Sequence, residues 1–324
     1  MSIPALAVHG IVKQFGNHLA VDEVSFEVKS GVVYGILGPN GAGKTTTLRM
    51  INDIIKPDRG VIQISGLAPG LEAARKIGYL PEERGLYPKM RVIDAIEFLG
   101  ELRGLSRRDA KLRGTQWLDK LGLGQWKTNK VQDLSKGMQQ KVQFAAALIH
   151  EPELVILDEP WSGLDPINAE VLRETVDEIR TSGRTVLFST HQMEQAEKVC
   201  DAVCIIARGK KILDGSLREI KQASASEGLI ALGFTDASAK AAAEKVLADP
   251  ALIAERRAPR AGAVADCEVR LAGSAEPRAL LSALLEAGVS VRLFEMITPT
   301  LHQIFVERVG DTAAVAARHE GDAA

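Results

Sequence analysis

The sequence predicts an α/β core over residues 1–222 and a smaller α+β domain over residues 223–310. In the first part, short aliphatic or β-branched runs recur, each followed by a loop and a helical pattern, which is typical of parallel strands. A helical stretch from about residue 87 to 150 interrupts these strands. Alanine accounts for 16 of residues 1–222 but for 26 of residues 223–324, so the composition changes at one point along the chain.

The first strands of the core are expected to pair in an antiparallel sheet. Ala5–Val8 and Val24–Val28 lie on either side of a turn signal at Gly16-Asn17. Gly60–Ser65 has the composition of a further strand. These segments predict an antiparallel β subdomain beside the main sheet.

Three buried parallel strands are expected at the centre of the core. They are Val33–Leu37, Leu154–Leu157 and Thr185–Ser189. Between the first two, the pattern becomes helical over about residues 87–150. One apolar stripe there consists of Val92, Ala95, Ile96, Leu99 and Leu102, and a second consists of Trp117, Leu118 and Leu121. The sequence therefore predicts a helical subdomain that interrupts the sheet.

Charge and composition exclude several classes of protein. The chain has 324 residues, with 40 Lys and Arg against 42 Asp and Glu, and a net charge of -2. This balance provides no broad positive field for a phosphate backbone, so we expect no direct nucleic-acid partner. No run approaches the ~20 apolar residues of a membrane span. Residues 1–10 lack the basic start and the apolar stretch of a signal peptide.

The three cysteines favour a reducing compartment. Cys200, Cys204 and Cys267 are too few and too irregularly spaced for a disulfide framework or a zinc site. The four-residue step from Cys200 to Cys204 is compatible with a metal or redox pair. Val203–Ile206 has the pattern of a buried strand, however, in which cysteine acts as a small apolar residue. We favour this second interpretation.

A glycine-rich segment carries the sharpest chemical signal. It consists of Gly38, Pro39, Asn40, Gly41, Ala42, Gly43, Lys44, Thr45 and Thr46, between the first buried strand and a helix expected over Thr45–Ile54. This matches the phosphate-loop pattern, in which glycines let backbone N–H groups face a polyphosphate at a helix N-terminus. Lys44 is expected to reach the outer phosphates and the Thr45 hydroxyl to bind Mg²⁺.

The second buried strand ends in two carboxylates, Asp158 and Glu159. Ligands of open α/β sheets bind at the carboxyl ends of the strands. Asp158 is expected to hold Mg²⁺ together with Thr45. Glu159 is expected to face the water that attacks the γ-phosphorus, as a general base. By itself, a pair of acidic residues at a strand end is weak evidence for a nucleotide site. It becomes strong evidence when the same chain also carries a phosphate loop.

Two further segments narrow the prediction to a family. Leu134–Lys141 precedes a helix expected over Val142–Ile149, and Ser162–Pro166 directly follows the carboxylates. With the phosphate loop, the acidic strand and a histidine at the end of Thr185–His191, the sequence resembles the ATP-binding subunits of ABC transporters over about residues 3–222. The resemblance implies a RecA-like P-loop NTPase core that binds and hydrolyses ATP with Mg²⁺.

The resemblance also implies a head-to-tail dimer, formed with a second copy or with another ATPase subunit. Ser135 and Gly137 of one subunit would contact the γ-phosphate held by the other, and Asp165 would communicate between the paired sites. His191 would contact the γ-phosphate and steady the attacking water, as a catalytic residue with Glu159 and Lys44. In isolation, Ser135 and Asp165 are also compatible with ordinary helix caps, and His191 with a polar residue at a helix start.

Phe15 occupies the position at which the family stacks an aromatic ring on adenine. A phenylalanine in the core is the competing interpretation, although only 14 aromatic residues occur in the whole chain. Stacking tolerates any base. Phe15 therefore does not by itself distinguish ATP from GTP.

Three positions depart from the family pattern. Lys136 and Met138 stand where the signature usually has glycine and glutamine, and Glu82 stands where a neutral glutamine usually binds Mg²⁺ and water. As a metal ligand, Glu82 would add negative charge beside the phosphates. The run Gly78–Leu86 is similar to that of sodium-exporting (Nat-type) subunits and related drug or peptide exporters, so we interpret the departures as a subfamily trait.

The second part of the chain predicts a small α+β domain of ferredoxin-like type. Strands are expected over Leu229–Phe234, Cys267–Leu271 and Val289–Phe294, and helices over Ala237–Leu247, Pro277–Ala287 and Thr300–Val309. A linker is expected over Gln222–Gly228 and a loose tail over residues 311–324. The domain carries no catalytic constellation and is similar to the C-terminal accessory domain of such exporter subunits, so interaction or regulation is its expected role.

The sequence therefore predicts an ATP-hydrolysing subunit of an ABC exporter. It would lie in the cytoplasm at the inner face of the membrane, attached to a separate permease that contacts Glu82–Arg91 and the helix Val92–Leu102. The apolar face of that helix is also compatible with ordinary core. The alternative is a non-transport ABC protein that acts as an ATP-dependent clamp or switch. Such proteins usually carry coiled coils or two ATPase halves, and this sequence has one phosphate loop and no heptad run.

Overall fold

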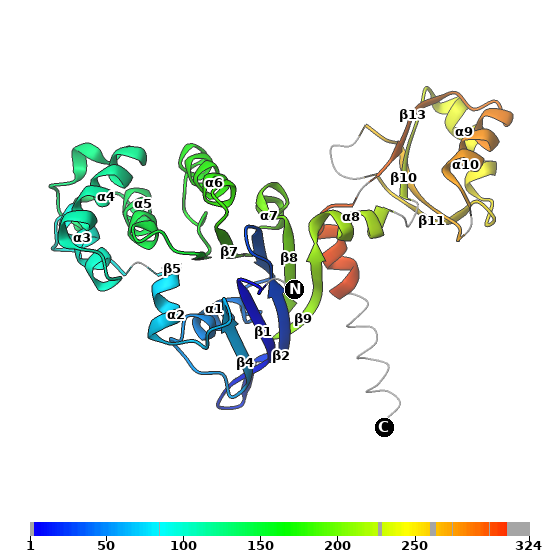
Figure 1. Cartoon of the computed structure of the whole chain (residues 1–324). Helices are drawn as coiled ribbons and strands as arrows, with labels where there is room; N and C mark the ends of the chain where they lie inside the picture. The colour runs from blue at the N-terminus through cyan, green and yellow to red at the C-terminus, as the bar shows by residue number, and fades with distance from the viewer. Residues whose placement is uncertain are drawn as a thin grey trace. The chain divides into compact units, whose positions relative to one another are not determined.

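The computed structural model describes residues 3–83, 85–225, 229–259, 264–273, 275–297 and 299–309. The chain divides into two compact units, one up to Leu217 and one over Arg218–Glu307 (Figure 1). This division falls a few residues before the domain boundary expected from composition. The tail expected over residues 311–324 lies outside the described residues.

A six-stranded sheet forms the centre of the first unit. Its strands, in spatial order, are β5 (Ile77–Leu80), β6 (Leu154–Asp158), β7 (Thr185–Thr190), β3 (Val33–Leu37), β8 (Ala202–Ala207) and β9 (Lys210–Ser216). All neighbours pair in parallel except β9, which is antiparallel to β8. The three strands expected at the centre, β6, β7 and β3, are adjacent. Their carboxyl ends therefore meet at one edge of the sheet.

A second, antiparallel sheet has the order β2-β1-β4. It contains β1 (Leu6–Phe15), β2 (His18–Val28) and β4 (Arg59–Ile64). Phe15 pairs with His18 across the expected turn at Gly16-Asn17. The antiparallel subdomain predicted from the sequence is thus present, with β1 and β2 both longer than expected.

One hydrophobic core joins the two sheets through the helix that follows the phosphate loop, α1 (Lys44–Ile51). Leu48 and Ile51 of α1 pack in it with Val8 of β1 and Ile36 and Ile156 of the main sheet. The opposite residues of the central strands are also buried, because α6 (Pro166–Thr181) and α7 (Met193–Val199) cover that face (Figure 1). Burial on both faces explains why these strands have continuous apolar sequences.

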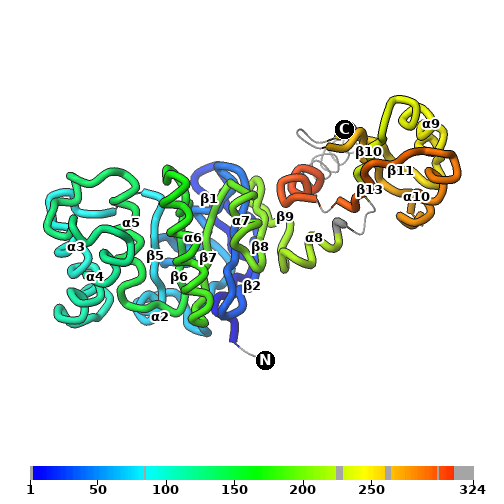
Figure 2. Tube along the Cα trace, turned by 90° about the horizontal axis from the view of Figure 1, so that it is seen from above, coloured from blue at the N-terminus to red at the C-terminus, as the bar shows by residue number. Residues whose placement is uncertain are grey.

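Three helices form the expected helical subdomain. They are α3 (Val92–Leu102), α4 (Arg107–Lys120) and α5 (Lys136–Leu148), and Figure 2 shows them grouped beyond the β5 edge of the sheet. The short helix α2 (Leu71–Lys76) leads into β5. α5 begins six residues earlier than the helix expected at Val142, because Ser135 caps it by accepting a hydrogen bond from the N–H of Met138 over 3.3 Å.

The predicted apolar stripe of α3 divides into two parts. Val92, Ala95 and Ile96 are fully buried, whereas Leu99 is half-buried and Leu102 is 65% exposed. The first part of the helix therefore packs in the core of the subdomain. The second part exposes apolar surface, so the interpretation of this stripe as ordinary core applies only to the first part of the helix.

The second unit confirms the ferredoxin-like prediction. It contains β10 (Leu229–Phe234), α9 (Ala237–Leu247), β11 (Ile253–Arg257), β12 (Cys267–Leu271), α10 (Pro277–Glu286) and β13 (Val291–Met296), and residues 301–309 are helical. The antiparallel order β11-β12-β10-β13 is that of two interlocked β-α-β units. α8 (Leu217–Ala225) occupies the first part of the expected linker, because alanine and glutamine there also suit a helix.

A half-buried histidine after α5 makes the stability of the first unit sensitive to acid. His150 Nε2 lies 2.9 Å from the carbonyl oxygen of Ile77, and its Nδ1 has no hydrogen-bond partner among the residues that the structure describes. Burial, with the positive charge of Arg103, lowers the pKa of His150 from 6.5 to about 4. The folded protein therefore holds this imidazole neutral at pH values where the unfolded chain protonates it.

We expect the free energy of unfolding to fall as the pH is lowered from about 6.5 towards 4, by at most about 3 kcal/mol from this group. Urea unfolding at several pH values would measure this loss. His150→Gln should remove this part of the pH dependence. The matched control is His9→Gln at an exposed histidine, which should leave it in place. If the free energy of unfolding depended on pH equally in the parent and in His150→Gln, the pH dependence could not be assigned to His150.

Candidate nucleotide site

The phosphate-loop segment connects β3 to α1 at the carboxyl edge of the main sheet. Two of its glycines are required by the geometry. Gly38 has φ 153° and a Cβ there would lie 2.0 Å from the carbonyl oxygen of Ile206, whereas Gly43 has φ 102° and a Cβ would lie 2.4 Å from that of Ala20. Any side chain at either position would collide with backbone. The loop is therefore held tightly between β2 and β8.

A pocket of about 380 Å³ opens over this loop. It is lined by Phe15, His18, Ala20, Asn40, Gly41, Ala42, Gly43, Lys44, Thr45, Thr46, Glu82 and Glu159. The structure thus brings together residues from β1, the loop, the segment after β5 and the end of β6. Most of the predicted phosphate, metal and base residues lie in or directly beside this pocket.

Lys44 is 6% exposed and its ammonium group lies at the base of the loop. Nζ donates hydrogen bonds to the carbonyl oxygens of Gly38 and Pro39, at 2.8 and 3.1 Å. It also lies 3.6 Å from Oε1 of Glu159. The cation is therefore placed between the phosphate loop and the acidic end of β6.

Asp158 is buried and its two oxygens differ in their partners. Oδ1 accepts hydrogen bonds from the hydroxyl of Thr45, at 3.2 Å, and from that of Ser189. Oδ2 is buried and has no hydrogen-bond partner among the described residues. Burial raises the pKa of this carboxyl, and the two hydroxyls oppose that shift. A buried, unpaired carboxylate oxygen beside a threonine hydroxyl fits a hard divalent cation such as Mg²⁺.

Glu159 is 8% exposed and has the left-handed backbone φ of 48°, an uncommon conformation for a residue other than glycine. Its Oε1 lies 3.0 Å from Nδ1 of His191, and its Oε2 accepts a hydrogen bond of 3.2 Å from the hydroxyl of Thr190. His191 is itself half exposed. The carboxylate is therefore held on one side by β7 and lines the pocket on the other.

The structure excludes the interpretation of Phe15 as a core residue. Its side chain is 48% exposed and lines the pocket, and the ammonium group of Lys13 lies 5.6 Å from the ring centroid. Glu82 lines the same pocket with Thr45 and Glu159. Both residues therefore line the pocket over the phosphate loop.

Ser135, Gly137 and Asp165 do not line this pocket. Ser135 caps α5, and Asp165 caps α6 by accepting a hydrogen bond of 3.0 Å from the N–H of Asn168. A Cβ at Gly137 would lie 3.7 Å from the side chain of Leu164, so the starts of the two helices are close together. The structure therefore gathers these three residues in one exposed region separate from the phosphate loop.

Four polar side chains around the site were not predicted from the sequence. They are Ser189 and Thr190 at the end of β7, and Gln140 and Gln143 on α5. Gln140 Nε2 donates to the carbonyl oxygen of Pro160 over 2.6 Å, and Gln143 Nε2 to that of Glu83 over 3.2 Å. For Ser189, Thr190 and Gln143 the available signal was a buried polar residue within or at the end of an apolar segment, which requires a hydrogen-bond partner.

Comparison with known proteins identifies the family. The family model for ABC transporters matches residues 21–162. A Bacillus subtilis (strain 168) protein, the uncharacterized ABC transporter ATP-binding protein YhaQ, is 38% identical over 305 residues, which cover 94% of this chain and 98% of that protein. The chain belongs to the ABC transporter ATP-binding proteins. The resemblance inferred from the motifs is confirmed, and with it the ATPase class of this subunit.

Two named relatives from Bacillus subtilis (strain 168) match the ATPase part. The ABC transporter ATP-binding protein NatA is 39% identical over 214 residues, covering 65% of this chain and 87% of NatA. The linearmycin resistance ATP-binding protein LnrL is 38% identical over 218 residues, covering 66% of this chain and 70% of LnrL. The expected similarity to Nat-type and other exporter subunits is therefore confirmed.

Solved structures and a second family model agree with the fold of this ABC subunit. The structure of an ATP-binding subunit of an ABC transporter matches with a TM-score of 0.63 and 31% identity, covering 68% of this chain and 92% of that one. The model for the C-terminal domain of DrrA1-3-like ATP-binding proteins matches residues 215–309. In the described part of the chain, every helix is too short or too polar to cross a bilayer.

Proposed function

We propose that this subunit binds Mg-ATP in the pocket over the phosphate loop and hydrolyses it to drive export through a separate membrane permease. The observation that carries the proposal is the meeting of two segments, the phosphate loop and the end of β6. Thr45 of the loop donates a hydrogen bond to Asp158, and Lys44 lies 3.6 Å from Glu159, which lines the pocket with Lys44 and Thr45. The names of LnrL and NatA support transport, and LnrL's role in resistance favours export. The subunit would then work at the cytoplasmic face of the membrane.

The chemistry follows from the placement of these groups. Backbone N–H groups of the loop and the Lys44 ammonium bind the outer phosphates of ATP, while Phe15 stacks on the base. Thr45, Asp158 and Glu82 would hold Mg²⁺, which offsets phosphate charge when bound. Glu159 orients a water towards the γ-phosphorus and accepts its proton.

His191 and the partner subunit complete the proposed site. His191 contacts the Glu159 carboxylate and would hold both it and the attacking water in place. Ser135 and Gly137 lie at the exposed N-terminus of α5, where N–H groups favour an anion. In a head-to-tail dimer they would reach the γ-phosphate bound by the other subunit, with Asp165 beside them. The separation of these residues from their own phosphate loop supports this arrangement.

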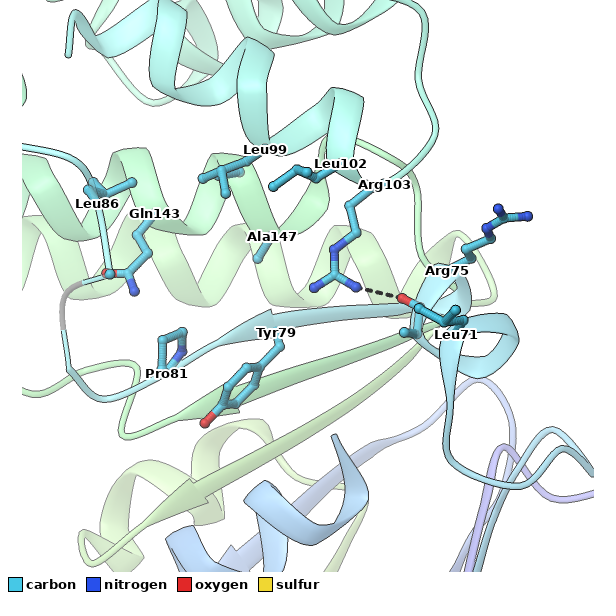
Figure 3. A pocket seen from close by; sticks show the side chains of 13 residues that line it. Leu71, Arg75, Tyr79, Pro81, Leu86, Leu99, Leu102, Arg103, Gln143 and Ala147 are labelled. Atoms are coloured by element: carbon cyan, nitrogen blue, oxygen red, sulfur yellow. Dashed lines mark hydrogen bonds between the residues drawn. The ribbon is translucent and has the colours of Figure 1, made fainter. Parts of the chain in front are cut away.

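A groove of about 490 Å³ between α2, α3 and α5 is the proposed contact for the permease (Figure 3). Leu71, Leu99 and Leu102 contribute apolar surface to it. Arg75 and Arg103 lie at the end of the groove where Leu71 and Leu102 are. Leu71 and Leu102 are 90% and 65% exposed. Exposed leucines beside arginines suit a helix with an apolar face and acidic residues. The groove includes Leu86 and α3, as expected from the sequence, and adds α2.

Co-purification from membranes, with identification of an attached permease, tests both the function and the groove. We expect Leu102→Asp to lower the amount of bound permease at least about tenfold, because a charge would replace apolar contact at the interface. The matched control is Leu112→Asp, at a leucine that is 58% exposed on α4 and does not line the groove. Both variants should bind ATP normally. Absence of any permease from the parent preparation would favour the ATP-dependent clamp instead.

Glu82 provides a test of the metal site. We expect Glu82→Gln to make turnover less dependent on Mg²⁺ concentration, because it removes a negative charge beside the phosphates but keeps an oxygen ligand. Its affinity for nucleotide without metal should be unchanged or slightly higher. Glu82→Ala should lose more activity, since it also removes the ligand. Phosphate release measured over a range of Mg²⁺ concentrations, with the permease present, would show both effects.

The control for Glu82 is Glu83→Gln, which removes the same charge one residue away. Glu83 is exposed and does not line the pocket, so its variant should keep the parental Mg²⁺ dependence. If Glu82→Gln and Glu82→Ala also matched the parent, Glu82 would be a solvated loop residue and not a metal ligand.

A further inference from the structure

The end of β7 places hydroxyl groups against the two carboxylates at the end of β6, those of Asp158 and Glu159. Ser189 is fully buried and Thr190 is 2% exposed. The Ser189 hydroxyl donates to Oδ1 of Asp158 and accepts a hydrogen bond of 3.2 Å from the backbone N–H of Glu159. Ser189 therefore contacts both acidic residues at once.

The parallel register of the two strands fixes this contact. Asp158 pairs directly with Ser189 in the β6–β7 ladder, and Leu157 pairs with Phe188. Phe188 is buried on the face where its ring meets Trp161 at 4.8 Å. A slip of one residue would move Phe188 to the other face, so packing holds the register. The serine hydroxyl consequently stays beside the carboxylate.

The orientation of the Asp158 carboxylate depends on these hydroxyls. Rotation about the last torsion of an aspartate has broad, roughly two-fold minima, so the side chain does not set its own plane. Here Oδ1 accepts from both Thr45 and Ser189, while Oδ2 has no hydrogen-bond partner among the described residues. Because both hydroxyls bind Oδ1, Oδ2 remains available to a different ligand, such as a metal ion.

We propose that Ser189 is a positioning residue for the divalent cation of the ATPase site, because it fixes the plane of the Asp158 carboxylate. This inference rests on the proposed role of Asp158 as a metal ligand. Removing the hydroxyl leaves Glu159 supported, since its N–H also reaches the carbonyl oxygen of Ser189 at 3.2 Å. The effect should therefore fall on metal binding and not on the general architecture of the site.

The test compares Ser189→Ala with Thr185→Val in the full chain. Thr185 is on the same strand, is 2% exposed, and accepts a hydrogen bond of 3.0 Å from the N–H of Gly31, at the end away from the carboxylates. Mn²⁺ bound in the presence of saturating ADP would be measured by electron paramagnetic resonance. We expect Ser189→Ala to weaken Mn²⁺ binding about tenfold, as losses of groups that orient metal ligands do. Thr185→Val should not change it.

ADP affinity in EDTA separates positioning from a structural role. It should stay within about twofold of the parent in Ser189→Ala, and Ser189→Thr, which restores the hydroxyl, should recover Mn²⁺ affinity. If Ser189→Ala does not fold, Ser189→Cys keeps the volume with a weak donor and should show the same loss. An equal loss in EDTA, or a loss shared by Thr185→Val, would overturn the inference.

Two outcomes distinguish this inference from the proposed function. If the parent binds Mn²⁺ with ADP but Ser189→Ala binds it equally well, the role of Ser189 is wrong and the metal site stands. If the parent shows no Mn²⁺ binding with ADP, the metal site and the role of Ser189 are both wrong.

Discussion

Replacing Lys44 by alanine is expected to abolish turnover and to weaken Mg-ATP binding by at least about 100-fold. The side chain is buried at the base of the phosphate loop, where its charge acts in a medium of low polarity. Phosphoryl transfer depends mainly on positioning and charge stabilisation, so loss of this cation affects both the bound state and the transition state. Titration with a fluorescent nucleotide and measurement of phosphate release would quantify the two losses.

Two further variants show whether the Lys44 effect is electrostatic. Lys44→Met keeps most of the side-chain volume and should lose binding as Lys44→Ala does. Lys56→Ala removes a lysine that lies shortly after α1, is exposed and pairs with Asp53, and it should behave as the parent. Thermal unfolding of all variants would show that the fold is retained. Near-parental turnover in either Lys44 variant would refute the proposed phosphate site.

The parts of the site that lie in continuous sequence were predictable. Residues 38–46 form the loop as a unit because the glycines, the lysine and the threonine act within one turn between a strand and a helix. Asp158 and Glu159 were predictable because a buried strand carries them to the same edge of the sheet. The exposure of Phe15 could not be derived, since it depends on the pairing of β1 with β2.

Contacts between distant segments were not predictable. Ser189 meets Asp158 through the register of two strands that are separated by a helix. The groove at α3 also depends on α2, which was not expected because its six residues contain only one large apolar side chain, Leu71. β11 was missed because it is an edge strand whose sequence, Ile-Ala-Glu-Arg-Arg, lacks apolar alternation. Its two arginines pair with Glu244 and Glu307.

Replacing Glu159 by glutamine is expected to slow hydrolysis by about 10³-fold while ATP remains bound. Glutamine keeps the length of the side chain and an oxygen that can accept the Thr190 hydroxyl, but it cannot take the proton of the attacking water. Thr45, Asp158 and Lys44 remain in place, so the phosphate and metal contacts should persist. With Mg-ATP the variant should accumulate as a dimer, whereas with ADP it should be monomeric. Size-exclusion chromatography with light scattering would measure both states.

A second substitution in the Glu159→Gln background tests which surface forms that dimer. Ser135→Ala should return it to a monomer, because the proposed contact of α5 with the partner's γ-phosphate is weakened. The same change also removes a helix cap, at a cost of about 1 kcal/mol. Ser106→Ala is the matched control, since Ser106 caps α4 through a hydrogen bond of 3.1 Å from the N–H of Asp109. It should leave the dimer intact. A monomer in Glu159→Gln alone, with ATP shown to be bound, would argue against the head-to-tail arrangement.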